Sequence, residues 1–198
     1  AGLGFLMKKG GRFYGQEKYG ANGVSWFDLI AETNAAFLHI ARTHPEISFV
    51  VKGKTGASQM QVEALGADVP ENVQIVQDGV GHNLLIDASV VIGFNSTTVL
   101  EAVAAGVPTI VPHIFSDREE PLKPYALEVC EAVFCPETRV ELEAMIIELA
   151  KKDSRYTELS SGQKEVLDRL LGNPDGQAGR RLKKFIDDIM VDGRSIKQ

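Results

Sequence analysis

The sequence predicts an α/β domain whose mainly parallel sheet has helices on both faces, giving three layers, with extra helices at the carboxyl end. Three observations carry this prediction. Short apolar runs rich in β-branched residues alternate with longer segments in which apolar residues recur at helical spacing. These short runs are apolar on both sides, as strands of a buried parallel sheet are. Glycine, proline and asparagine separate the runs, so each predicted element has a recognisable end.

The clearest unit runs from Ser89 to Phe115. Ser89–Gly93 predicts a short strand, and the small polar side chains of Asn95–Thr98 are typical of a helix start. Gly106 ends that helix, and Val107–Val111 predicts the next buried strand. This is half of a βαβ crossover. Because N–H groups at a helix start lack internal partners, its turn is suited to an anion.

The whole chain divides into two parts. Residues 1–24 form a glycine-rich leading segment, partly loop over Gly10–Gly23, and residues 25–198 form the domain. The elements predicted up to the central unit are an edge strand at Leu3–Met7, a helix from Ser25 to the residue before His44-Pro45, strands at Ile47–Val51 and Val73–Val76, and helices at 57–66 and 81–87.

The chain after this unit is predicted to be mostly helical. The expected elements are a helix at 125–132, a short strand at Val133-Phe134, a helix from the cap residue Thr138 to Ala150, a helix from Ser154 to Leu171 and a final amphipathic helix after the break at 173–176. In the final helix the apolar residues share one stripe, and the basic residues Arg180, Arg181, Lys183 and Lys184 lie off it.

Composition excludes several classes of protein. The net charge of −6 argues against a nucleic-acid partner, because phosphate backbones require a basic face. No apolar run approaches the roughly 20 residues of a membrane span, and no signal-peptide pattern opens the sequence. Cys130 and Cys135 lack metal-ligand spacing and are predicted to be reduced thiols, which favours the cytoplasm.

Known cofactor and catalytic motifs are missing from the sequence. It has neither GxGxxG after a strand nor GxxxxGK[ST], so dinucleotide and P-loop sites lack support. It also shows no Ser-His-Asp order and no cluster of metal ligands, and we therefore expect no metal and no bound cofactor. What the sequence does offer is nucleotide-phosphate binding without an evident general base.

Polar residues follow the predicted strands at their carboxyl ends. Lys52 and Lys54 follow one strand, Asp78 and Gly79 a second, Asn95–Thr98 a third, and His113 a fourth. Right-handed crossovers bring the carboxyl ends of parallel strands to one edge, where ligands of such sheets bind. The shared position of these residues, rather than any one of them, predicts a site.

Each candidate also has an ordinary structural interpretation. Asn95, Ser96, Thr97 and Thr98 could bind a phosphate or merely cap the helix, although one cap needs only one such residue. Glu101 could reach a ribose diol, or could complete a capping box with Thr98. Lys52 and Lys54 could neutralise a diphosphate or be a solvated pair. His113 and the Asp78-Gly79 turn could line the cleft or be unremarkable loop residues.

Three stretches of the sequence resemble a known family. Val91–Thr98, with Leu100–Ala102 and Gly106–Pro108, resembles the donor-binding half of GT-B glycosyltransferases, those of bacterial surface-carbohydrate and capsular-polysaccharide synthesis above all. Phe49–Lys54 resembles the strand and lysine pair of that group. Asn173–Gly176 and the amphipathic helix after it resemble its C-terminal segment. The likeness covers about residues 25 to 190.

The resemblance implies a Rossmann-like fold, the C-terminal half of a GT-B enzyme, that binds a nucleotide sugar without metal. It implies that Ser96–Thr98, with Asn95, hold the donor phosphates, that Glu101 holds the ribose, and that Lys52 and Lys54 assist the leaving group. Many retaining members carry a glutamate eight residues before the ribose glutamate, where this chain has Gly93. The stereochemical outcome therefore stays open.

The resemblance also implies partners that the sequence does not contain. A separate N-terminal domain would bind a glycan or lipid-linked acceptor and supply the catalytic base, so the catalytic residues are unknown and this part alone is expected to be nearly inactive. The expected function is donor binding in the cytoplasmic transfer of a sugar to a bacterial surface glycan, with the membrane reached through partners. The alternatives are a nucleotide-sugar 2-epimerase, a non-catalytic nucleotide-binding module and a polyprenol-phosphate-glycerol transferase.

Overall fold

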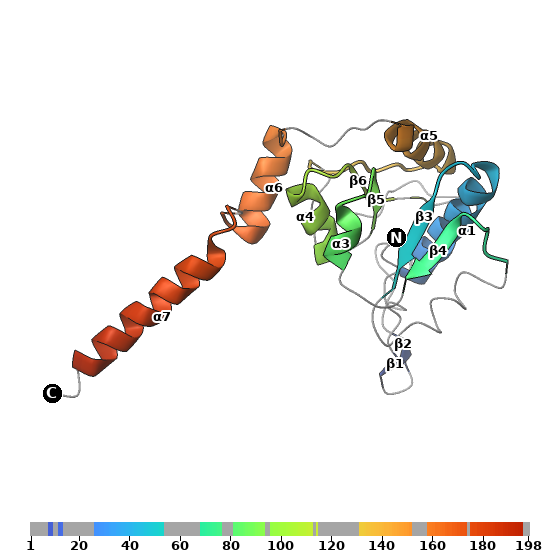
Figure 1. Cartoon of the computed structure of the whole chain (residues 1–198). Helices are drawn as coiled ribbons and strands as arrows, with labels where there is room; N and C mark the ends of the chain where they lie inside the picture. Colours follow the sequence, from blue (N-terminus) through green and yellow to red (C-terminus); the bar gives the residue numbers. More distant parts are fainter. Residues whose placement is uncertain are drawn as a thin grey trace, which may run out of the picture.

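Figure 1 shows the computed structural model of the chain, which describes residues 8–9, 12–13, 26–53, 68–76, 81–93, 96–112, 114, 131–151, 158–173 and 175–195. Side chains are described within these ranges from residue 33 to residue 190. Several predictions lie outside the described residues. These are the Leu3–Met7 strand, the helix at 57–66, most of the helix at 125–132, Cys130, and the candidate site residues Lys54, Asp78, Gly79, Asn95 and His113.

The described strands are short and pair mainly in parallel. β3 (Phe49–Lys52) pairs in parallel with β4 (Val73–Val76), and β5 (Val91–Ile92) pairs in parallel with β6 (Thr109–Ile110). Ile110 also forms a parallel bridge with Phe134, so β6 has a partner on either side. These pairings confirm an α/β fold with parallel strands.

The leading segment holds one pairing that the sequence did not predict. β1 (Lys8–Lys9) and β2 (Arg12–Phe13) form a small antiparallel hairpin. The prediction of loop over the whole of Gly10–Gly23 is therefore wrong at β2. Two-residue strands carry no apolar alternation that could be read from sequence.

One hydrophobic cluster joins α1 (Trp26–Thr43) and α5 (Arg139–Lys151) to β3, β4 and β6. The rings of Phe37 and Phe49 meet edge to face, with centroids 5.2 Å apart. Ile110 and Ile146 are completely buried in the same cluster. Both parallel strand pairs therefore share one core, as expected of a single α/β body.

Two further clusters hold the remaining helices of the body. α3 (Gly81–Leu85) packs Leu85 against Ala102 of α4 (Thr97–Ala104) and against Val107. On its other side α4 buries Val99, Leu100 and Val103 with α6 (Ser161–Leu171). The helix α4 thus packs against both α3 and α6.

The end of α4 follows the prediction for Gly106. This glycine has a φ of 71°, a left-handed conformation that side chains disfavour. Its N–H bonds the carbonyl of Val103, and the N–H of Val107 bonds that of Ala102. This is the Schellman pattern of a glycine-terminated helix, and it turns the chain directly into β6.

Asn72 fixes the chain between α1 and β3. Its Nδ2 lies 2.9 Å from the Ala41 carbonyl oxygen, 3.1 Å from that of His44 and 2.8 Å from that of Ile47. The Asn72 carbonyl in turn accepts the N–H of Phe49, where β3 begins. One side chain therefore satisfies the carbonyls at the end of α1 and sets the start of the strand ladder.

Several predicted bounds shift for reasons visible in the hydrogen bonds. β3 starts two residues after the predicted Ile47, because the carbonyl of that residue is occupied by Asn72. β6 is shorter than Val107–Val111, because Val107 completes the end of α4. The predicted helix start at Ser154 is wrong: residues 158–160 are not helical, and Ser160 and Gln163 form a capping box that begins α6 at Ser161.

Thr138 and the final helix agree with the prediction. The Thr138 hydroxyl accepts the N–H of Glu141 at 3.1 Å and so caps α5. The final helix, α7 (Ala178–Ser195), extends away from the rest of the molecule in Figure 1. None of the described helices is long and apolar enough to span a bilayer.

Candidate functional site

The first turn of α4 carries three of the candidate residues. Ser96 is the cap residue, with extended backbone angles, and its Oγ accepts the N–H of Thr98 at 3.3 Å. This hydrogen bond is longer than most and leaves the N–H available to a better acceptor. β5 ends at Ile92, shortly before this turn, so a strand of a parallel pair precedes the helix start.

Thr97 and Thr98 are exposed on that turn. The helix begins at Thr97, so Thr98 lies inside it rather than at its cap. The alternative of a capping box between Thr98 and Glu101 is therefore excluded. The hydroxyls of Thr97 and Thr98 are not needed for the cap that Ser96 provides.

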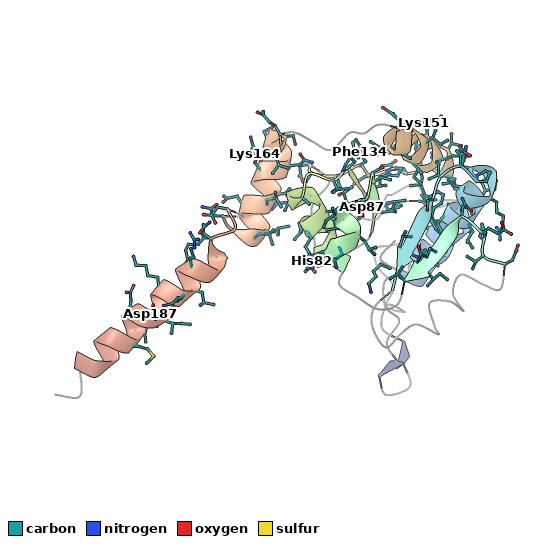
Figure 2. The ribbon with its side chains drawn as sticks, viewed as in Figure 1. His82, Asp87, Phe134, Lys151, Lys164 and Asp187 are labelled. Atoms are coloured by element: carbon teal, nitrogen blue, oxygen red, sulfur yellow. The ribbon has the colours of Figure 1, made fainter. Side chains whose placement is uncertain are left out.

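Glu101 lies one turn further along α4, and its carboxylate contacts a histidine of the neighbouring helix. Its Oε2 is 3.1 Å from Nε2 of His82 in α3, and the two side chains are 36% and 64% exposed. Figure 2 labels His82 on α3, beside α4. The imidazole fixes one carboxylate oxygen, while solvent still reaches the pair.

Sequence reasoning missed His82. The contact depends on the packing of Leu85 against Ala102 and Val107, which brings α3 against α4. That packing joins residues 17 apart in the chain (85 to 102), so no local sequence pattern predicts it. The available signal was a histidine at the second position of a short helix that precedes the central strand.

Lys52 occupies a different strand pair. It ends β3, opposite Val76 of β4, and its ammonium donates to the carbonyl of Gly53. The structure therefore confirms its position at the carboxyl end of a parallel strand. It does not pair that strand with β5 or β6, so the grouping of Lys52 with the α4 turn stays a prediction.

Gly93 directly follows β5 and lies against Val99 of α4. It is buried, and a Cβ atom built on it would lie 3.0 Å from Cγ2 of Val99. Such a contact is tighter than ordinary packing, and Val99 is itself buried. A larger side chain at this position would press against Val99, so the packing here favours glycine.

The described part of the chain brings a helix start with exposed hydroxyls close in sequence to a carboxylate that contacts a histidine. A helix start with exposed hydroxyls suits a phosphate, and a carboxylate held by an imidazole suits a pair of hydroxyls. No group of three or more histidine, cysteine, aspartate or glutamate side chains among the described residues is arranged to bind a metal ion.

Comparison with known proteins gives one weak structural likeness. No protein-family model matches the sequence, and no curated protein matches it. A mutant O-GlcNAc transferase from Thermobaculum terrenum is similar with a TM-score of 0.46 and 17% identity, over 84% of this chain and 35% of that one. The chain thus spans about a third of that protein's length. A likeness of this degree establishes neither a fold family nor a function.

Proposed function

We propose that this chain is the nucleotide-sugar-binding domain of a glycosyltransferase of the GT-B type, with a Rossmann-like three-layer arrangement. One observation carries the proposal. A short parallel strand, β5, leads into a helix start with two exposed hydroxyls beyond its cap, and the carboxylate of Glu101 lies one turn further on, held by His82. A nucleoside diphosphate offers both anionic phosphates and a ribose diol to such groups.

The roles follow from these groups. Ser96, Thr97 and Thr98, together with Asn95, bind the donor phosphates, and Glu101 accepts hydrogen bonds from the ribose. Lys52 and Lys54 supply positive charge to the diphosphate, while Asp78, Gly79 and His113 line the cleft. Fixed donors of this kind stabilise the negative charge that builds on the leaving phosphate as the sugar departs.

The proposed reaction needs a second domain. The sugar passes from the nucleotide to a glycan or lipid-linked acceptor of the bacterial surface, on the cytoplasmic side, and the acceptor domain supplies the catalytic base. This chain has Gly93 where many retaining members carry a glutamate, and a Cβ there would press against Val99. The donor domain therefore binds and orients, and the chemistry is completed across the cleft.

A thermal-shift panel tests the proposal directly, with UDP, GDP, CMP, CDP and their sugar conjugates. A ligand that binds only the folded state at about 100 times its Kd stabilises a protein by about 2.7 kcal/mol. For a chain of this size that raises Tm by about 5 to 10 °C. We expect one base to give this shift, and a flat panel at millimolar ligand would overturn the proposal.

Matched cap variants separate ligand binding from stability. Ser96→Ala and Ser160→Ala each remove the cap of one helix and should each cost about 1 kcal/mol. Only Ser96→Ala, and Thr97→Val beside it, should weaken nucleotide binding, by about tenfold per lost hydrogen bond to phosphate. Unchanged nucleotide affinity in the Ser96→Ala, Thr97→Ala double variant would show that the turn only caps the helix and does not bind phosphate.

The rival enzyme class is distinguished by its products. A nucleotide-sugar 2-epimerase alters its substrate without an acceptor, whereas a transferase releases the nucleoside diphosphate when an acceptor is present. With the acceptor domain supplied, acceptor-dependent release of nucleoside diphosphate supports the transferase. A change in the sugar without acceptor supports the epimerase.

A further inference from the structure

The helix α7 carries a continuous stripe of exposed apolar side chains. The helical spacing places five large residues on one side, and each is 48% to 62% exposed: Leu182, Phe185, Ile186, Ile189 and Met190. Single exposed apolar residues are ordinary on protein surfaces, but a contiguous stripe marks a surface that another molecule covers. The stripe lies on the segment that extends away from the body in Figure 1.

The start of this helix is held firmly. Nη1 of Arg181 lies 2.7 and 2.8 Å from the two carboxylate oxygens of Asp175, and Nη2 donates to the Asn173 carbonyl. Asp175 also accepts the N–H of Gln177, and the bond from Arg181 lowers the pKa of Asp175. The stripe is therefore presented on a helix whose beginning is anchored.

Charged residues border the stripe in an ordered way. Lys183 and Asp187 lie four residues apart on one flank, with Nζ 2.6 Å from Oδ2. Arg181 and Asp188 lie seven residues apart, two helical turns, on the other flank. On each flank the basic residue precedes the acidic residue, and both sets centre near Phe185 and Ile186.

This order favours one orientation of a second copy. When two identical helices pack antiparallel, each flank faces the same flank of its partner in reverse. Lys183 then faces the second copy's Asp187. Arg181, which is already bound to Asp175 of its own chain, lies at the level of the second copy's Asp188. In a parallel pair, Lys183 would instead face Arg181 and Asp187 would face Asp188, which places like charges together. Opposite charges therefore face each other only in the antiparallel arrangement.

We propose that α7 is a self-association surface, on which a second copy of this chain packs antiparallel about Phe185 and Ile186. The apolar stripes bury one another, and the flanking charges fix the direction. An anionic membrane is the alternative occupant of the same stripe, because α7 carries more basic than acidic residues: Arg180, Arg181, Lys183, Lys184 and Arg194 against Asp187, Asp188 and Asp192. The order of the charges along both flanks is what favours a second copy.

Light scattering on the whole chain tests the association. We expect a mass of twice 21.5 kDa that falls toward 21.5 kDa on dilution. Ile186→Asp should lower the dimer affinity by at least tenfold. The control is Val140→Asp on α5, which alters a more exposed apolar residue away from the stripe and should leave the dimer intact. A monomer at every concentration up to millimolar overturns the proposal.

Cysteine crosslinking tests the direction, in a background with Cys130→Ser and Cys135→Ser. Leu182→Cys mixed with Met190→Cys should form a crosslinked pair under oxidation, whereas Leu182→Cys alone should not. Self-crosslinking of Leu182→Cys alone would show a parallel pair and overturn the orientation. Monomers that instead sediment with phosphatidylserine vesicles would assign the stripe to a membrane.

A charge reversal provides the matched variant. Lys183→Asp alone should lower dimer affinity about tenfold, because it faces Asp187 of the second copy. Adding Asp187→Lys should restore it, because the pair is regenerated with opposite polarity. Lys183 and Asp187 also pair within one helix, so helix content is measured by circular dichroism alongside the dimer affinity. A dimer affinity that is lost and restored while helix content stays constant supports the contact between copies, and an affinity that only follows helix content contradicts it.

Discussion

Nε2 of His82 lies 3.1 Å from Oε2 of Glu101, so the second residue of α3 holds the carboxylate that projects from the first turns of α4. Both side chains are partly exposed, and exposed ion pairs contribute little to folding. The pair lies beside a helix start that is suited to phosphate. Its value is therefore expected in ligand binding rather than in stability.

The first prediction separates these two roles. Glu101→Gln should change the free energy of unfolding by less than about 1 kcal/mol, measured by urea denaturation. It should weaken binding of the nucleoside diphosphate by about tenfold, because a hydrogen bond to a charged acceptor is lost. Calorimetry with the 2′,3′-dideoxy nucleotide is the control. Equal losses with both nucleotides would contradict the contact with ribose.

His82 provides a second variant of the same pair. His82→Gln retains a side-chain donor for the Glu101 carboxylate, whereas His82→Ala removes it. Nucleotide affinity should therefore fall in the alanine variant and be largely retained in the glutamine variant, with similar unfolding midpoints for both. If the two variants lose affinity equally, the imidazole has a role other than orienting Glu101.

Gly93→Ala should destabilise the protein by about 1 to 3 kcal/mol, because its Cβ would press against Val99 in a packed core. The control is Gly81→Ala, where a Cβ meets no atom within 4 Å. That change lies in α3 and should be neutral or slightly stabilising. The Gly93→Ala, Val99→Ala double variant should lose less stability than the sum of the losses in the two single variants. A loss equal to that sum would argue against the contact.

Asn72→Ala should cost about 1 to 3 kcal/mol, since three carbonyls around the end of α1 lose their donor. Asn72→Asp should cost as much or more at neutral pH, because a carboxylate would face those carbonyl oxygens. Glu71→Ala changes the exposed neighbour in the same turn and is the control. Urea denaturation measures all three, and a loss shared by Glu71→Ala would point to the turn rather than to Asn72.

His44 makes part of the stability depend on pH. Its Nε2 lies 2.8 Å from Oε1 of Glu143, and its Nδ1 lies 3.3 Å from Oε1 of Glu46. The bond to Glu143, aided by Glu46, raises the pKa of His44 above 6.5. Because the folded pKa is the higher one, this contribution is complete below the unfolded value and is lost as pH rises through the folded value.

The corresponding measurement is the urea midpoint at about pH 5.5 and about pH 8.5, on either side of the histidine titration. His44→Gln should lose stability at the lower pH and little at the higher. His39→Gln, which alters an exposed histidine of α1, should keep the pH dependence of the parent chain. A midpoint difference unchanged in His44→Gln would assign the dependence to other groups.

Local patterns predicted those parts of the fold that local chemistry determines. The β-branched runs, the polar helix start that Ser96 caps, the cap residue Thr138 and the glycine stop at Gly106 each act within a few residues. The cap at Thr138 and the stop at Gly106 have their expected places, and the strands β3 to β6 lie within the predicted runs or overlap them. The α6 start was misplaced, because the capping box of Ser160 and Gln163 outweighed the helical periodicity before it.

The candidate site was predictable only where it is contiguous. Ser96, Thr97, Thr98 and Glu101 lie on one helical turn and the next, so sequence spacing alone brings them together. His82 joins them through the packing of α3, and the burial of Gly93 under Val99 arises from tertiary contact. Interactions of this kind depend on how whole elements pack, which no short window of sequence contains.

The pairing of β6 on both sides protects backbone amides whose hydrogen exchange can be measured. The N–H of Gly93 bonds the Ile110 carbonyl on one side of β6, and the N–H of Val111 bonds the Phe134 carbonyl on the other. Deuterium replaces these two amide protons when the strands separate. Their exchange rates therefore report how often the pairing around β6 opens. Amides in α7 would exchange at rates set by the unfolding of that helix alone.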